Sequence, residues 1–202
     1  MNRQVAIGIS VLFHPAIMPT LAFSILLFAL PQSFASEAKW YLLGYVLVVT
    51  FLFPAINIWW LYRIGLIRSL FMKERSDRPP VFWTTFIYYV GLALMFFWET
   101  GFSELTQTML AIVFTLLVAS IITQFYKVSA HAIGIGGVWG LCLAWALQNP
   151  ENDILLLLMI AILIICGIVI SARLALEAHT PKEAYSGFLV GALGCVTFVL
   201  WS

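Results

Sequence analysis

Residues 154–173 have the sequence ILLLLMIAILIICGIVISAR, in which the only charged side chain is the arginine at the last position. A helix of about 20 apolar residues is long enough to cross the hydrocarbon core of a bilayer. A strand of a membrane barrel would alternate polar and apolar residues, and this stretch does not alternate. It therefore predicts a transmembrane α-helix.

The rest of the chain has the same character. Of its 202 residues, 63% are hydrophobic and 9% are charged, whereas about 25% are charged in a typical soluble domain. The sequence therefore predicts an all-α polytopic transmembrane helical bundle, a single domain over residues 1–202, embedded in a bilayer. Because two of the apolar stretches are short, six or seven spans are expected. They cover residues 5–30, 40–62, 81–98, 105–126, 130–147, 154–173 and 182–201.

The composition argues against several function classes. The net charge is +1, without a basic stripe or tail, so nucleic acid is not an expected partner. The three cysteines stand apart inside apolar stretches and form no C-x-x-C pair, which is evidence against a zinc site or a disulfide framework. We interpret them as small apolar fillers.

Proline and glycine interrupt several of the apolar stretches. Pro15, Pro19 and Pro54 are expected to kink their helices, which a membrane bundle tolerates because neighbouring groups can bond the freed carbonyls. Two glycine pairs have the four-residue spacing of closely packed helices, and we interpret them as contacts within one bundle rather than as a dimer interface. These pairs are Gly136/Gly140 and Gly187/Gly191.

The charged residues are distributed unevenly between the two sides of the membrane. Seven alternating spans place nine of the ten basic residues on one side, and only Lys39 on the other. Since cytoplasmic loops are enriched in lysine and arginine, the basic side is predicted to face the cytoplasm of a cell membrane. The nine residues are Arg3, Arg63, Arg68, Lys73, Arg75, Arg78, Lys127, Arg173 and Lys182.

Three short polar segments share the basic side. An arginine presents a fork of donors that fits phosphate oxygens, and a lysine adds a point charge. Lys73, Arg78 and Arg173 therefore form a candidate phosphate-binding cluster. The segments are KERSDRP at residues 73–79, KVSAH at residues 127–131 and SARLALEAHTPKE at residues 171–183.

Two histidines lie in these segments. Ser129 is expected to cap a helix whose first turn contains His131, and free N–H groups of a first turn make an anion site. His179 and Glu183 are four residues apart and would share a face of a continuing helix, so that the carboxylate orients the imidazole. A second interpretation remains open, because residues 180–183 (TPKE) are also a capping box in which Glu183 only caps the last helix.

Other polar side chains have simpler interpretations. Lys127 and Lys182 are expected to anchor span ends at the interface. His14 precedes a proline inside the first span, and we interpret it as a satisfied interior histidine rather than as a substrate contact.

Together the three segments resemble the tripartite signature of the type-2 phosphatidic-acid phosphatase superfamily. That signature reads K-x6-R-P, P-S-G-H and S-R-x5-H-x3-D. This chain has Lys73-x4-Arg78-Pro79, then Val128-Ser129-Ala130-His131, then Arg173-x5-His179-x3-Glu183. It departs from the pattern in the shorter first spacing, in the residues beside Ser129, in Ala172 for serine and in Glu183 for aspartate. Two apolar stretches also separate the first two motifs, which usually share one loop.

The resemblance implies a lipid phosphatase that needs no metal or other cofactor. His179 would attack phosphorus and form a phospho-histidine, His131 would protonate the leaving oxygen, and Glu183 would orient His179. The implied substrate is a membrane lipid phosphate or diphosphate, of the phosphatidic acid, phosphatidylglycerophosphate or undecaprenyl diphosphate class. The residues implied to hold the phosphoryl oxygens are Lys73, Arg78, Arg173, Ser129 and Ala130, the last through its backbone N–H.

Two alternatives stay open from the sequence. A phosphotransferase would pass the phosphoryl group from a lipid to an acceptor other than water. A non-catalytic bundle would bind anionic lipid headgroups or transport a substrate.

Overall fold

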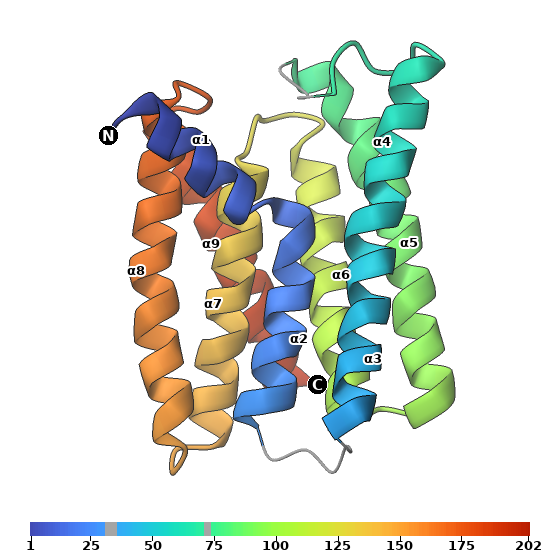
Figure 1. Cartoon of the computed structure of the whole chain (residues 1–202), viewed down its shortest axis with the longest axis vertical. Helices are drawn as coiled ribbons and strands as arrows, with labels where there is room; N and C mark the ends of the chain where they lie inside the picture. The colour runs from blue at the N-terminus through green and yellow to red at the C-terminus, as the bar shows by residue number, and fades with distance from the viewer. Residues whose placement is uncertain (31–35, 71–73) are drawn as a thin grey trace.

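A computed structural model describes residues 1–30, 36–70 and 74–202 of the chain. Long helices stand side by side in one bundle (Figure 1), and the described residues contain no strand, which confirms the predicted all-α architecture. The elements are α1 (Arg3–Leu12), η1 (Pro15–Ile17), α2 (Met18–Ala29), α3 (Ser36–Leu47), η2 (Val48–Leu52), α4 (Phe53–Arg63), η3 (Arg75–Asp77), α5 (Arg78–Thr100), α6 (Glu104–Ile122), α7 (Ala130–Gln148), α8 (Asp153–Ala175) and α9 (Pro181–Trp201).

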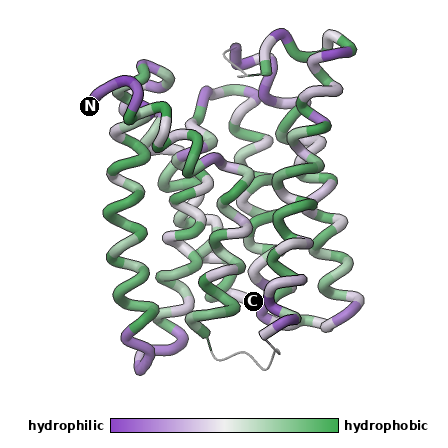
Figure 2. Tube along the Cα trace, in the orientation of Figure 1, coloured by the Kyte–Doolittle hydropathy of each residue, from purple (hydrophilic) through white to green (hydrophobic). Residues whose placement is uncertain are grey.

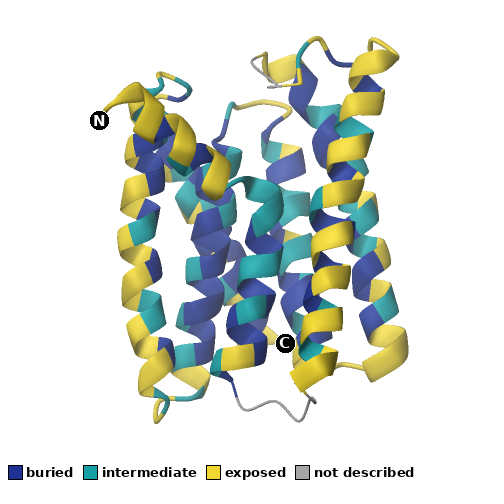
Figure 3. Cartoon of the chain, viewed as in Figure 1, coloured by how far each residue is buried: buried dark blue, intermediate teal, exposed yellow. Residues whose placement is uncertain are grey.

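Among the residues that the structure describes, seven helical stretches are long and apolar enough to cross a membrane. The third, Arg75–Thr100, is longer than the predicted 81–98, because Pro79 and Pro80 lie in the first turn of α5, where a missing N–H costs no hydrogen bond. Polar residues gather at the two ends of the bundle (Figure 2), and exposed residues line the outward faces of α3 and α8 (Figure 3). Those on α8 are mostly leucine and isoleucine, as expected of a multi-pass membrane protein whose outer face meets lipid.

The ends of the bundle correspond to the two predicted sides. The N-terminus and the connections that precede α5, α7 and α9 lie at one end (Figure 1), and the C-terminus lies towards the other. The described residues of all three polar segments therefore meet at the same end.

The first span is broken rather than kinked. α1 ends at Leu12, His14 has an extended backbone with φ −63° and ψ 137°, and the short turn η1 begins at Pro15. A proline has no N–H to donate to the preceding turn, so a helix cannot continue through it without losing a bond. Figure 1 shows α1 leaning across the end of the bundle, away from the axis of α2.

The second span contains a π-helical turn, η2, immediately before Pro54. Pro54 cannot donate to the carbonyl of Thr50, and the Tyr89 hydroxyl on α5 donates to this carbonyl instead, at 3.2 Å. This neighbour-supplied bond is the mechanism predicted for prolines in the spans.

Helices α7 and α9 approach each other through glycines. A Cβ atom at Gly136 would lie 2.6 Å from the Phe188 carbonyl oxygen, and one at Gly187 would lie 2.8 Å from the Ser129 carbonyl oxygen. Cβ atoms at Gly140 and Gly191 would collide with backbone atoms of the partner helix in the same way. The glycine pairs therefore serve packing within the bundle, as predicted, and they bring the first turns of α7 and α9 together.

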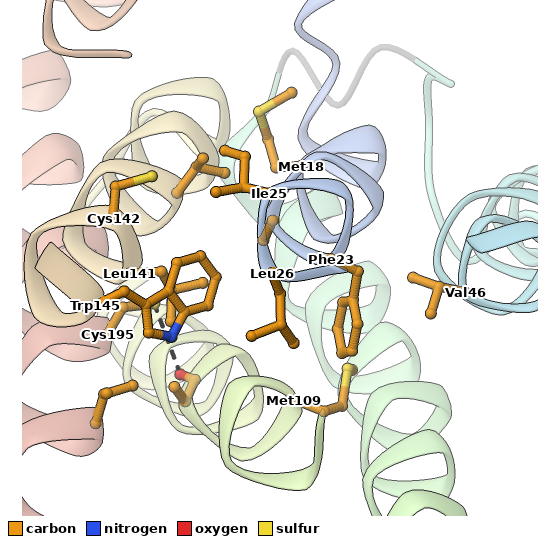
Figure 4. Packing of buried hydrophobic residues seen from close by; sticks show 14 of the residues in the cluster. Met18, Phe23, Ile25, Leu26, Val46, Met109, Leu141, Cys142, Trp145 and Cys195 are labelled. Carbon is orange, nitrogen blue, oxygen red and sulfur yellow. Dashed lines mark hydrogen bonds between the residues drawn. The ribbon is translucent and has the colours of Figure 1, made fainter. Parts of the chain in front are cut away.

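The core fills the space between α2, α6, α7 and α9 (Figure 4). Phe23 and Leu26 on α2 face Met109 on α6, and all three are fully buried. The three cysteines are free and buried, which agrees with their interpretation as apolar fillers.

Candidate active site

The three polar segments are joined by hydrogen bonds at one end of the bundle. The Arg78 Nη1 atom, at the start of α5, donates to the Val128 carbonyl oxygen at 2.6 Å. The Ser129 N–H, just before α7, donates to the Glu183 carbonyl oxygen on α9 at 3.2 Å. The first segment is thus attached to the second, and the second to the third.

His179 and Glu183 form a bonded pair, although not on a continuing helix. α9 begins at Pro181, and His179 precedes the capping residue Thr180. Glu183 reaches back because it closes a capping box: its Oε2 accepts from the Thr180 N–H at 3.3 Å and from His179 Nδ1 at 2.9 Å. The contacts expected from both interpretations are therefore present at once, since one oxygen of Glu183 both caps the helix and binds the imidazole.

This pairing determines which nitrogen of His179 carries the proton. A carboxylate only accepts hydrogen bonds, so Nδ1 must donate and Nε2 keeps a free lone pair. Burial lowers the pKa of His179, the bond to Glu183 opposes this shift, and the charges of Arg78, Arg173 and Lys127 lower the pKa further. The imidazole is therefore neutral at neutral pH, with a nucleophilic nitrogen available.

Two arginines beside this pair lack carboxylate partners. Arg78 is 8% exposed, and its Nε has no hydrogen-bond partner; the Nε of Arg173 is likewise buried and unpartnered. Neither arginine makes an ion pair within 4.0 Å with a residue that the structure describes. The charge of the Glu183 carboxylate acts on Arg78 only from a longer distance. Burying a guanidinium without a close counter-charge is costly, so this arrangement is suited to an anion that binds directly to the arginines.

The first turn of α7 adds backbone donors to the cluster. Ser129 caps the helix as predicted, with its Oγ accepting from the Ala132 N–H at 3.4 Å. The N–H groups of Ala130 and His131 have no acceptor within the described part of the chain. Free N–H groups in the first turn of a helix are donors of the kind that bind phosphate.

His131 and Arg173 share a partner that sequence reasoning did not identify. His131 Nε2 lies 3.0 Å from the Ser10 carbonyl oxygen, and Arg173 Nη1 donates to Ser10 Oγ, also at 3.0 Å. His14 accepts a bond from the Ala16 N–H at its Nδ1 and places its ring 5.8 Å from that of His131. His14 is thus a satisfied interior histidine as predicted, but it lies against the site.

A hollow of 440 Å³ lies in front of His179 and Glu183. Lys127 lines it, and its charge acts on His179, so this residue belongs to the site and not only to the membrane interface. Its position directly before the second motif was the sequence signal for this role. Leu174, Glu177 and Pro181 also line the hollow.

The predicted site residues are thus largely brought together. His179, Glu183, Arg78, Arg173, Ser129, Ala130 and His131 belong to one cluster at the polar end of the bundle. Lys73 lies outside the described residues. Comparisons of the chain with protein-family models, with curated proteins and with solved structures found no match.

Proposed function

We propose that this protein is an integral membrane phosphatase that removes phosphate from a lipid phosphate or lipid diphosphate. The observation that carries the proposal is a buried and a half-buried arginine, Arg78 and Arg173, neither with a carboxylate within ion-pair distance, beside a neutral, carboxylate-oriented histidine. A phosphoryl group supplies the charge that these arginines lack, and it is the substrate of a histidine nucleophile.

In the first step, the Nε2 lone pair of His179 attacks phosphorus. The bond between phosphorus and the lipid oxygen breaks as the new P–N bond forms. His131, in its protonated form, gives its extra proton to the leaving oxygen, so the dephosphorylated lipid leaves as an alcohol, or as a monophosphate when the substrate is a diphosphate. Arg78 and Arg173 neutralise the charge on the equatorial oxygens, which is the main requirement of phosphoryl transfer.

In the second step, water attacks the phospho-histidine. His131, now neutral, takes a proton from that water, the P–N bond breaks, and inorganic phosphate leaves. His179 returns to its starting tautomer because Glu183 still accepts its Nδ1 proton.

The location of the site supports a lipid substrate. The hollow opens at the polar end of a bundle whose sides are apolar, so a headgroup can enter while its acyl or prenyl chains stay in the bilayer. A phosphate lipid of the phosphatidic acid, phosphatidylglycerophosphate or undecaprenyl diphosphate class meets this requirement.

Phosphate release from purified protein tests the proposal. The wild type, His179→Ala and His131→Ala are compared in detergent on a panel of lipid phosphates, with a chelator present. We expect release by the wild type, with losses of at least 100-fold in both variants. The mechanism is wrong if His179→Ala still releases phosphate, or if the wild type releases phosphate from none of the lipids. Transfer to an added alcohol without release would indicate a phosphotransferase, and lipid binding without turnover a non-catalytic bundle.

We further propose that the site faces the cytoplasm of a cell membrane. Lys73, Arg78 and Arg173 are candidate ligands and Lys127 lines the hollow, and five basic residues against Lys39 remain when these four are left out. Reporter enzymes fused to the C-terminus and inserted in the loop at residues 99–104 test this orientation. A cytoplasmic signal from the loop would overturn it.

A further inference from the structure

The break in the first span leaves one carbonyl group without a helical partner. α1 closes with the Phe13 N–H donating to the Ile9 carbonyl oxygen. The next bond of a continuing helix would join the His14 N–H to the Ser10 carbonyl, but the extended backbone of His14 turns the chain away before Pro15. The Ser10 carbonyl therefore accepts from a group outside α1.

Both oxygens of Ser10 accept hydrogen bonds from residues of the candidate site. Its carbonyl oxygen lies 3.0 Å from His131 Nε2, and its hydroxyl oxygen accepts from Arg173 Nη1 at 3.0 Å. The residue is 7% exposed, so water does not compete strongly for either bond. One residue of α1 thus holds a histidine of the second motif and an arginine of the third.

The bond to Ser10 also determines the tautomer of His131. A carbonyl oxygen has no proton to donate, so Nε2 must carry one. In the neutral ring, Nδ1 is then the nitrogen with a lone pair, and the second proton is gained and given there. His179 shows the opposite arrangement, because its Nδ1 is held by Glu183.

We propose that α1 is a fourth component of the site and that Ser10 is its positioning residue. Its carbonyl orients His131 so that Nδ1 transfers the proton, and its hydroxyl holds the guanidinium of Arg173 in place. This inference rests on the proposed phosphatase function. It assigns a role to a segment outside the three motifs, at the far end of the chain from His179.

The first test is a measurement of histidine tautomers that needs no activity. The chain has three histidines, so NMR of protein with isotope-labelled imidazole nitrogens gives three ring patterns, and His14→Gln assigns one of them. At neutral pH we expect the proton of His131 on Nε2 and that of His179 on Nδ1. In Pro15→Ala, α1 can continue through residue 15, and the His14 N–H can donate to the Ser10 carbonyl in place of His131. The ring pattern of His131 should therefore change.

The second test separates KM from kcat. Ser10→Ala removes the acceptor of Arg173 and keeps the carbonyl, so KM should rise about tenfold, as expected for one lost bond to a charged group, with little change in kcat. Pro15→Ala should lower kcat instead. Ser24→Ala is the matched control, because this hydroxyl in the same span bonds only its own helix, at the Thr20 carbonyl. Pro19→Ala is the control for Pro15, because Pro19 lies in the first turn of α2.

The outcomes separate this inference from the proposed function. If no lipid phosphate is hydrolysed but the ring patterns are as expected, the placement of Ser10 stands and the phosphatase proposal fails. If phosphate is released while His131 carries its proton on Nδ1, the inference is overturned and the phosphatase proposal stands. An unchanged KM in folded Ser10→Ala also overturns it.

Discussion

Replacing Glu183 by glutamine will separate its two structural roles. The single oxygen Oε2 accepts from His179 Nδ1 at 2.9 Å and from the Thr180 N–H at 3.3 Å. An amide oxygen can still accept from Thr180, but the amide has no charge and its NH2 group can donate to Nδ1. That contact would favour the tautomer with the proton on Nε2, which has no lone pair for attack on phosphorus.

The distances indicate the size of each effect. The bond to His179 is short and charge-assisted, and such bonds contribute about 1.5–3 kcal/mol. Its loss in Glu183→Gln should therefore lower kcat by about 10- to 150-fold, with one factor of ten for every ~1.4 kcal/mol. Thr180→Ala removes the other half of the capping box, and it should lower the free energy of unfolding by about 1 kcal/mol while leaving kcat nearly unchanged.

The assay measures phosphate release at saturating lipid substrate, together with thermal unfolding of each variant in detergent. We expect Glu183→Gln to keep the stability of the wild type and to lose rate. We expect Thr180→Ala to lose stability and to keep the rate of the wild type. A normal rate in Glu183→Gln would refute the orienting role and leave Glu183 as a cap. Equal losses of rate in the two variants would show that capping, rather than charge, sustains the site.

Three further predictions concern other parts of the site. Burial lowers the pKa of His179 below its ordinary value of 6.5, so its neutral form persists as the pH falls. In a pH profile, kcat/KM should therefore begin to fall on the acidic side only below pH 6.5. A fall that begins above pH 6.5 would contradict the expected environment of His179. In Gly187→Ala, a Cβ atom would lie 2.8 Å from the Ser129 carbonyl oxygen and would push α7 from α9. Phosphate release should fall at least tenfold, whereas Gly167→Ala, with no atom within 4 Å of the added group, should keep its activity. Glu177 has φ +52°, so Glu177→Gly should raise the free energy of unfolding by about 1 kcal/mol, measured by denaturation in detergent, and a lower stability would refute the strain.

The spans were predictable because the signal for each is local. A run of apolar residues identifies a membrane helix without reference to its neighbours, and all seven predicted stretches coincide with helices. The boundaries were less accurate where caps or prolines act. The fourth span ends at Ile122 rather than at the predicted residue 126, and Pro79 and Pro80 lie in the first turn of α5 rather than before the helix.

The site was predictable only in part, because spacing reports neighbours along the chain and not across the bundle. The five residues between Arg173 and His179 kept both at one end of the bundle. The pair His179–Glu183 was expected on one helix, and it arises instead from a capping box. Ser10 belongs to no motif and lies 121 residues before His131 in the sequence. Its role depends on the helix break that follows it at His14.

The uneven charge distribution consists of two populations, and exposure distinguishes them. Arg78 is buried and Arg173 is half-buried, and both have neutral oxygen partners and an unpartnered Nε, as expected of cations that are held for an anionic ligand. The other population is exposed at the same end of the bundle, where cations meet water and lipid headgroups. Only this population should report orientation, since a ligand-binding cation is kept for its chemistry on either side of a membrane. It still outnumbers the single Lys39 of the opposite end. Its members are Arg3, Arg63, Arg68, Arg75 and Lys182.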